Sequence, residues 1–463
     1  MFSLSGAISN ALSALQAQQG ALNVTSNNIS NVNTPGYSLQ RAVFIETTPI
    51  SDGSLQFGTG VTLEGIQSIR DKMLQLQLDQ EGQQEGKLSA YSSAMSQVEA
   101  LFNETGGVGL EGYLSNFFSS LQNLSTNPTS MPLRQQVITS AQNLAGAFHQ
   151  SASNLDSLQG SVDLTVSQSV NNINGLTQQV AALNQQITGL VGTGQEPGSL
   201  VDQRDQLVRQ LSGLVGLNVI DAGNTSVTLT TSGGSALVVG NQAIDLQTQI
   251  DPATGFQHIV YQGSDITWSI DGGQLGGLLQ ARDVSIPQVK TDLDTLASSL
   301  ANAFNAAHKA GFDLNGVAGG DFFVPPPASG AGAAASFAVA LTDPTLLAAS
   351  SDGSPGSNGN LSALSALQNQ KIVAGQSPED FYSNFIAQIG NNVQQTNTDL
   401  QAEGLLKTQL ENQRGAVSGV SLDEEAANLL RFQQAYQAAA RVVTVVDNLT
   451  QNVLNIGYGW SSL

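Results

Sequence analysis

The two ends of the chain carry apolar residues at alternating spacings of three and four, which places them along one narrow stripe of a helix, as in a coiled coil. The N-terminal stripe consists of Leu4, Ile8, Ala11, Leu15, Gln18, Leu22, Thr25 and Ile29. The C-terminal stripe consists of Leu422, Leu429, Phe432, Tyr436, Ala439, Val443, Val446, Thr450 and Val453. Such narrow helices are marginal alone, so they need partners, either each other within one domain or other subunits. The pattern alone does not decide between packing within one domain and packing between subunits.

Polar residues mark where the first helix ends and the last one begins. Residues 31–36 end the first helix, and the turn motif there consists of Asn27, Asn28, Asn31, Asn33, Pro35, Gly36 and Tyr37. Asparagine side chains bond backbone groups at turns, and a proline disfavours helix at the residue before it. Ser421 and Glu424 form a capping box, and the acidic residues 423–425 favour a helix N-terminus.

Between the two ends the pattern changes twice. Helical periodicity covers 68–103, 133–190, 199–215, 286–310, 361–374 and 378–416, whereas glycine and proline interrupt 104–132. From 217 to 273, apolar residues alternate between turn signals, as in Val227/Leu229 and Ile266/Trp268/Ile270, which predicts short antiparallel strands. The segment 311–360 is rich in Gly, Pro, Ala and Ser, and we expect loop with scattered strands there.

The predicted fold class is α+β: long helical coiled-coil and bundle domains built from both chain ends, with an inserted antiparallel β-rich outer domain. Residues 1–36 and 418–463 would form a terminal coiled-coil assembly domain. Residues 37–216 and 286–417 would form a helical rod-like domain, and 217–285 the β-rich outer domain.

Charge and composition exclude several classes of function. With 15 Lys and Arg against 36 Asp and Glu, the net charge is −21, which argues against nucleic acid and anionic membranes as partners. The chain has no cysteine, which excludes disulfides and thiolate metal sites. The N-terminus lacks the basic and apolar regions of a cleaved signal peptide, and no apolar stretch is long enough to span a bilayer. We therefore expect a protein without membrane insertion.

Catalytic and metal-binding patterns are weak. His149, His258 and His308 are far apart, and neither HExxH nor GxSxG occurs. The glycine-rich 272–277 lacks the residues of a phosphate loop, and we interpret it as a turn between a strand and a helix. The acidic residues 423–425 fit a helix N-terminus better than a calcium site. We expect no enzyme, no metal and no cofactor.

Two terminal motifs resemble those of a known group of proteins. SNNISNVNTPGYSLQ resembles the N-terminal signature of bacterial flagellar rod, hook and hook-associated axial proteins, and 418–443 resembles their C-terminal signature. Within that group the chain is most similar to the flagellar hook-associated protein 1 family, through 273–283, 311–323 and 341–350. Hook and rod proteins usually have Gly-Phe where this chain has Gly36-Tyr37. At Leu39 the chain departs from the signature, which has a basic residue there; Arg41 is a candidate to replace it.

The resemblance implies a structural axial protein that forms the junction between hook and filament and is needed for filament assembly. It implies an extracellular place in the flagellum, reached by type III export without a cleaved signal peptide. The implied partners are further copies in a helical ring or tube, the hook protein, the second hook-filament junction protein and a dedicated export chaperone. The assembly interface would consist of the apolar stripe residues, and we expect both ends to become ordered on assembly.

Two alternatives remain at this point. A hook or distal-rod protein is of the same class but has another position in the axis. A secreted adhesin or carbohydrate-binding protein would instead use the β-rich centre, where Tyr261 and Trp268 supply aromatic rings.

Overall fold

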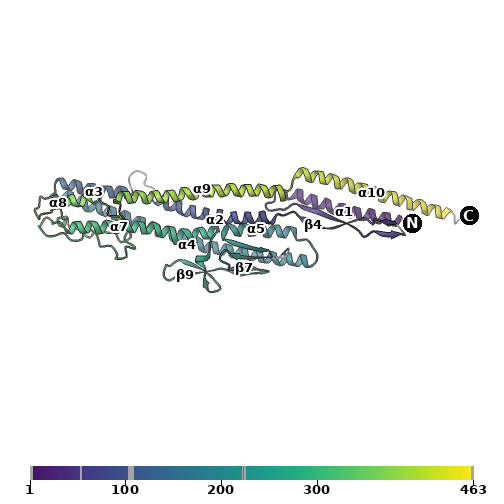
Figure 1. Cartoon of the computed structure of the whole chain (residues 1–463), viewed down its shortest axis with the longest axis horizontal. Coiled ribbons are helices and arrows are strands. Elements are labelled where there is room, and N and C mark those ends of the chain that lie inside the picture. The colour runs from purple at the N-terminus through teal and green to yellow at the C-terminus, as the bar shows by residue number, and fades with distance from the viewer. Residues whose placement is uncertain (1–3, 53–54, 103–108, 222, 224–225, 460–463) are drawn as a thin grey trace. The chain divides into compact units, whose positions relative to one another are not determined.

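The computed structural model describes residues 4–52, 55–102, 109–221, 223 and 226–459. Long helices and small antiparallel sheets make up the fold, and the predicted α+β class is confirmed (Figure 1). The chain divides into two compact units. Unit 1 comprises Met1–Gln84, Asn172–Leu246 and Glu403–Leu463, and unit 2 comprises Glu85–Asn171 and Gln247–Ala402.

The two terminal helices lie side by side in unit 1 (Figure 1). They are α1 (Leu4–Ser30) and α10 (Leu422–Gly459). Strands β1 (Gln40–Glu46) and β4 (Val61–Ser68) form an antiparallel pair that packs on α1, and β2 (Ile50–Asp52) pairs with β3 (Leu55–Phe57). Phe44 of β1 meets Phe432 of α10 edge to face at 6.5 Å between ring centroids. Gly20 permits close packing, because a Cβ there would lie 2.7 Å from Leu63 of β4.

A four-stranded sheet completes unit 1, next to parts of several long helices. The helices are the ends of α4 (Met131–Gly192) and α9 (Pro378–Ser418), the start of α2 (Lys72–Leu101), and α5 (Gly198–Leu214). The strands are β5 (Leu217–Asp221), β6 (Val227–Thr231), β7 (Ala236–Val239) and β8 (Gln242–Ala243), in that order across the sheet. Asn184 of α4 anchors it, because its amide donates to the carbonyls of Val227 and Gly240 and accepts from the Val227 N–H.

Unit 2 is a helical body with a small sheet. Its helices are α3 (Leu110–Thr126), α6 (Gly273–Gln280), α7 (Ile286–Lys309) and α8 (Gly359–Ala366), with parts of α2, α4 and α9. The sheet has the order β11 (Ser264–Asp265), β10 (Gln257–Tyr261), β9 (Gln247–Ile250). Phe117, Phe304, Phe322 and Phe323 are fully buried and pack together in tilted and edge-to-face pairs, with 4.8 Å between the ring centroids of Phe304 and Phe322. This aromatic cluster is the core of unit 2.

A buried arginine joins the small sheet to α4. Arg282 lies in a π-helical turn between α6 and α7 and is 1% exposed. Its Nη1 donates to Asp163 Oδ1 at 2.6 Å and to the Gln257 carbonyl at 2.8 Å, while Nε and Nη2 donate to Asp283. Each nitrogen of the guanidinium therefore donates a hydrogen bond, as a buried charge requires.

Several local predictions differ from the structure. The expected strand at 266–270 is wrong: Thr267–Ser269 is a 3-10 helix, because Asp265 Oδ1 accepts from both the backbone N–H and the hydroxyl of Thr267 and caps a tight turn. The glycine-rich 272–277 is not only a turn, since α6 begins at Gly273. Helix α3 fills much of the interrupted segment 104–132, and 361–374 is helical only to Ala366. Strands β5–β8 belong to unit 1 and β9–β11 to unit 2. The predicted domain boundaries themselves stay a prediction.

The buried His308 predicts an acid-sensitive unit 2. Its Nδ1 donates to the Gly320 carbonyl at 2.8 Å and its Nε2 accepts the Ala348 N–H at 2.9 Å, so the ring is neutral. Burial lowers its pKa. Below about pH 6.5 the unfolded state therefore takes up a proton that the fold resists, and stability falls. Urea unfolding should show about 1 kcal/mol less stability at pH 5.5 than at pH 7.5 from this group. The variant His308→Gln should reduce the dependence of stability on pH, whereas His149→Gln, at an exposed position, should leave it unchanged. The same pH dependence in the wild type and both variants would contradict the role of His308.

Candidate assembly site

Asn28, in the last turn of α1, is the centre of a buried polar junction. Its side chain is 1% exposed. Oδ1 accepts from the Tyr37 hydroxyl at 2.8 Å and from the Gln40 N–H at 3.1 Å. Nδ2 donates to the Gln40 carbonyl at 2.8 Å and to Glu425 Oε2 at 2.9 Å. An asparagine amide has two donor and two acceptor positions, and all are used here. Asn28 thereby joins the end of α1, the start of β1 and the first turn of α10.

The other turn residues shape the path of the chain between α1 and β1. Asn31 donates from its backbone and its side chain to the Asn27 carbonyl, and its Oδ1 accepts from Thr34. Asn33 and Pro35 are exposed. Gly36 has φ +86°, the left-handed conformation that favours glycine. Its carbonyl accepts from Arg414 at 2.7 Å.

Tyr37 is held as a neutral hydrogen-bond donor. Burial raises its pKa to about 12, with a further contribution from the negative charges of Asp202 and Glu425. The protonated hydroxyl donates to Asn28 and accepts from Asn27 Nδ2 at 3.3 Å. A phenylalanine at this position would lack both bonds.

The residues after the turn fasten β1 to α5. The backbone N–H and hydroxyl of Ser38 donate to Asp202 at 3.1 and 2.8 Å, and Arg70 Nε donates to the same carboxylate at 3.0 Å. Leu39, where the signature has a basic residue, is 7% exposed and is held by backbone bonds to Ser418 and Ile69. An apolar residue suits this buried position, and Arg41 is exposed on β1.

The predicted stripe residues on α1 and α10 differ in how far they are buried. On α1, Ala11 is buried and Leu4, Ile8, Leu15, Leu22 and Ile29 are half-buried. On α10, Val446 is buried, Leu429, Phe432 and Val443 are half-buried, and Leu422, Tyr436 and Val453 are exposed. Helices α1 and α10 pack against each other. The role of these side chains between subunits stays a prediction.

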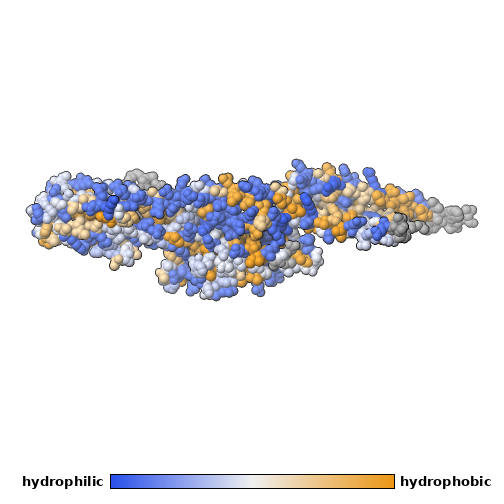
Figure 2. Space-filling view, viewed as in Figure 1, coloured by the Kyte–Doolittle hydropathy of each residue, from blue (hydrophilic) through white to orange (hydrophobic). Residues whose placement is uncertain are grey.

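A second apolar face of α10 was missed by the sequence analysis. Val442, Val445 and Leu449 are 46%, 56% and 48% exposed and share one side of the helix through spacings of three and four. We call this the outer α10 face. Figure 2 shows apolar surface along this end of unit 1. The signal in the sequence was the doubled valines at 442–443 and 445–446, since each pair turns one valine toward α1 and the other outward.

The first turn of α10 differs in detail from the predicted capping. Ser421 precedes the helix, and its carbonyl accepts the Glu425 N–H at 2.9 Å. Glu424 is exposed, whereas Glu425 is 4% exposed and accepts from Asn28 and Asn428. The side-chain bonds of a capping box between Ser421 and Glu424 stay a prediction. The sequence analysis did not identify Glu425 as the structurally important carboxylate.

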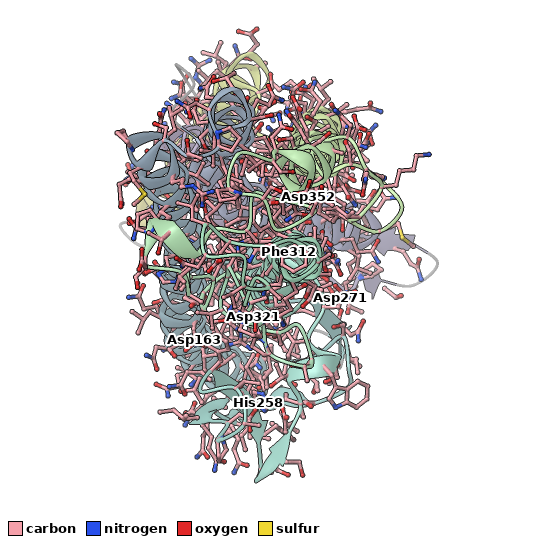
Figure 3. All side chains as sticks on the ribbon, turned by 90° about the vertical axis from the view of Figure 1, so that its left-hand side faces the viewer. Asp163, His258, Asp271, Phe312, Asp321 and Asp352 are labelled. Atoms are coloured by element: carbon pink, nitrogen blue, oxygen red, sulfur yellow. The ribbon has the colours of Figure 1, made fainter. Side chains whose placement is uncertain are left out.

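The described residues offer no metal centre. None of their His, Asp and Glu side chains form a group of three or more that could hold a metal ion. In Figure 3, His258 on β10 lies apart from Asp321 and Asp352. Within the described part of the chain, no helix has the length and apolar character needed to cross a membrane.

Both termini and the helical middle match models of flagellar protein families. Residues 8–37 match "Flagella basal body rod protein" and 413–456 match "Flagellar basal body rod FlgEFG protein C-terminal". Residues 95–323 match "Flagellar hook-associated protein FlgK helical domain". The paired terminal helices and these matches define an axial structural protein of the bacterial flagellum.

Full-length comparisons narrow the class to one family. The chain is 30% identical to flagellar hook-associated protein 1 of Escherichia coli K12, over 98% of this chain and 100% of that one. It is 32% identical to the Bacillus subtilis protein of the same name, over 96% of each. The solved hook junction protein FlgK of Burkholderia pseudomallei shares the fold, with a TM-score of 0.66, 20% identity, and coverage of 74% of this chain and all of that one. The chain belongs to the flagellar hook-associated protein 1 family, which confirms the resemblance.

Proposed function

We propose that the chain forms the junction between hook and filament and has no enzymatic activity. The observation that carries this is the paired terminal helices, locked together through Asn28 and Glu425, with the outer α10 face left uncovered in the single chain. Family membership supports the position in the axis, and the names of the relatives support hook association. The hook and distal-rod alternative is less favoured, because 95–323 matches the helical domain of hook-associated proteins.

Self-association would use the outer α10 face. An exposed apolar stripe on a long helix is a typical contact surface. Helix α1 contains no charged residue at all between Leu4 and Ser30, so neighbouring subunits could approach without repulsion. In an open helical tube each contact joins two different surfaces, and the outer face of one subunit would meet another part of its neighbour. Val453, a stripe residue that remains exposed and lies four positions after Leu449, would extend this contact.

The remaining assignments follow from the family resemblance. The proposed partners are further copies in a ring or tube, the hook protein, the second junction protein and a dedicated export chaperone. The proposed place is outside the cell in the flagellum, reached without a cleaved signal peptide. The terminal assembly domain, the rod-like domain and the outer β-rich domain are proposed with the boundaries predicted from sequence.

Removing the outer α10 face should abolish assembly without unfolding the subunit. In the triple variant Val442→Ser, Val445→Ser, Leu449→Ser, we expect a folded, exported protein that no longer supports filaments, because the lost side chains face outward. The measurement is motility together with filament subunits released unpolymerised into the medium. The matched control replaces Leu164, Val284 and Val317, which are 60–66% exposed in unit 2, with serine. Intact filaments on the α10 variant would refute the assignment.

A separate prediction concerns how well the terminal helices are ordered in the free monomer. We expect α1 and α10 to exchange amide hydrogens faster in the free monomer than in the assembled flagellum, since a narrow two-helix contact is marginal alone. Hydrogen exchange of purified monomer and of isolated hook-filament junctions measures this. Strong protection of both helices in the monomer would count against it.

A further inference from the structure

A small groove lies in unit 2, and residues of α7 and α9 make up most of its wall. Its volume is about 180 Å³. The most deeply buried side chains that line it are apolar and at most 6% exposed: Met95, Val289, Phe385 and Ile389. Pockets for small molecules usually have about 300–1,000 Å³. The groove is therefore small for a metabolite, but it can hold one large side chain.

The wall of the groove carries one carboxylate without a cation beside it. Asp292 of α7 is half-buried, and its Oδ1 accepts from Gln288 Nε2 at 3.0 Å. Burial raises the pKa of Asp292 and the bond from Gln288 lowers it, while no cation among the described residues contributes. The exposed Gln388 and Asn392 add uncharged amides to the wall. Such a groove suits an apolar side chain that carries one N–H donor.

Trp268 is a side chain of this kind, and its own subunit does not bury it. It is 87% exposed, more than any other large apolar side chain that the structure describes. The 3-10 turn that carries it is held on both sides. Asp265 Oδ1 accepts the N–H of Thr267 at 2.9 Å, and the Thr267 hydroxyl accepts the N–H of the buried Ile259 at 2.7 Å. The indole ring is therefore presented to solvent from a fixed base.

We propose that Trp268 of one subunit inserts into the groove between α7 and α9 of a second copy of the chain. The indole ring would cover the apolar side chains of the groove, and its Nε1–H would donate to the carboxylate of Asp292. Tryptophans that fill a pocket on the partner are typical energetic centres of protein interfaces. Each subunit offers one tryptophan and one groove, which are different surfaces, so the contact can continue from subunit to subunit in an open assembly.

This contact deepens the proposed self-association, and it would act in addition to the outer α10 face. Stable interfaces bury about 1,200–2,000 Å², far more than one side chain supplies. The contact should therefore be weak between free subunits and stronger where other contacts already hold them together. All proteins in the test carry Val442→Ser, Val445→Ser and Leu449→Ser, which remove the outer α10 face. A failure of this test is then distinct from a failure of the junction role, which motility measures.

Mixing two complementary variants tests the contact. The first variant is Trp268→Ala, which keeps the groove, and the second is Gln388→Phe, which keeps the tryptophan and places a ring in the groove. In sedimentation velocity at high protein concentration, each variant alone should associate at least tenfold more weakly than the parent. An equimolar mixture should form a 1:1 dimer that does not grow further. The control Leu164→Ser, at a 66% exposed position of unit 2, should associate like the parent. A parent that stays monomeric, equal association of all proteins, or a mixture without dimer overturns the proposal.

Fluorescence follows the indole ring directly. The chain has two tryptophans, so Trp460→Phe leaves Trp268 as the single reporter. Its emission should move to shorter wavelength as the protein concentration rises, because the ring leaves water when it enters the groove of another subunit. With Gln388→Phe added, the emission should stay constant. A spectrum that does not change with concentration, or the same change with and without Gln388→Phe, overturns the proposal.

Discussion

Asn28→Ala is expected to destabilise unit 1 by about 3–5 kcal/mol, close to the largest effects that single substitutions produce. The amide makes four hydrogen bonds at a 1% exposed position. Alanine removes all of them and leaves the Gln40 backbone, the Tyr37 hydroxyl and the Glu425 carboxylate short of a partner. Unpaired buried polar groups cost about 1–3 kcal/mol each, and charged groups more. Urea unfolding followed by circular dichroism measures the loss.

The matched control is Asn31→Ala in the same turn. Asn31 also makes side-chain bonds, but they stay within the exposed turn, to Asn27 and Thr34. We expect a loss of about 1 kcal/mol or less there. Glu425→Gln should lie between the two, because the glutamine oxygen can still accept from Asn28 without the charge. Similar losses for Asn28→Ala and Asn31→Ala would show that the junction is not where the stability resides.

The helices could be predicted from sequence because their signals are local. Periodicity over tens of residues placed α2, α4, α5, α7, α9 and α10 within a few residues of their observed bounds. The hairpins between β1 and β4 were not predicted, since their short strands are only half-buried and are held by packing on α1. The strand expected at 266–270 failed because Asp265 caps a turn that periodicity cannot reveal.

The candidate site could be predicted only in part, because its central contact joins residues that are far apart in the sequence. The sequence identified Asn28 as a turn residue, but its bond to Glu425 spans 397 positions. The helix-capping pattern pointed to Glu424, one residue from the carboxylate that is buried. The stripes indicated α1 and α10, which pack on each other, yet the outer α10 face became visible only once α1 was seen to cover the other side.

The second large effect is expected at Asp79 of α2, whose ionised form opposes folding. The side chain is 3% exposed beside a cluster of Leu74, Leu78 and Leu410. Burial raises its pKa to about 7, and the charge of Asp205 adds to this, while Arg209 and the bond from Gln75 act in the opposite direction. In the unfolded chain the group titrates near about 4.

The sign follows from where the proton is bound. Between pH 4 and 7 the folded state holds a proton that the unfolded state has lost, so raising the pH weakens the fold. This contribution is fully present below about pH 4 and is gone above about pH 8. A shift of about three pKa units corresponds to about 4 kcal/mol at most. Glu81, whose pKa is also raised to about 7 by burial and by Glu403, titrates in the same range and adds to the slope.

Asp79→Asn should therefore stabilise unit 1 at pH 8 by about 2–4 kcal/mol and much less at pH 5. The asparagine oxygen can still accept from Gln75, so the hydrogen bond is kept while the charge is removed. Urea midpoints at pH 5, 6.5 and 8 measure the effect. The exposed Asp447→Asn on α10 is the control and should leave the pH slope unchanged. A variant with the wild-type slope, or one that is less stable at pH 8, would show that Asp79 is ionised in the fold and that the arginines nearby already compensate its charge.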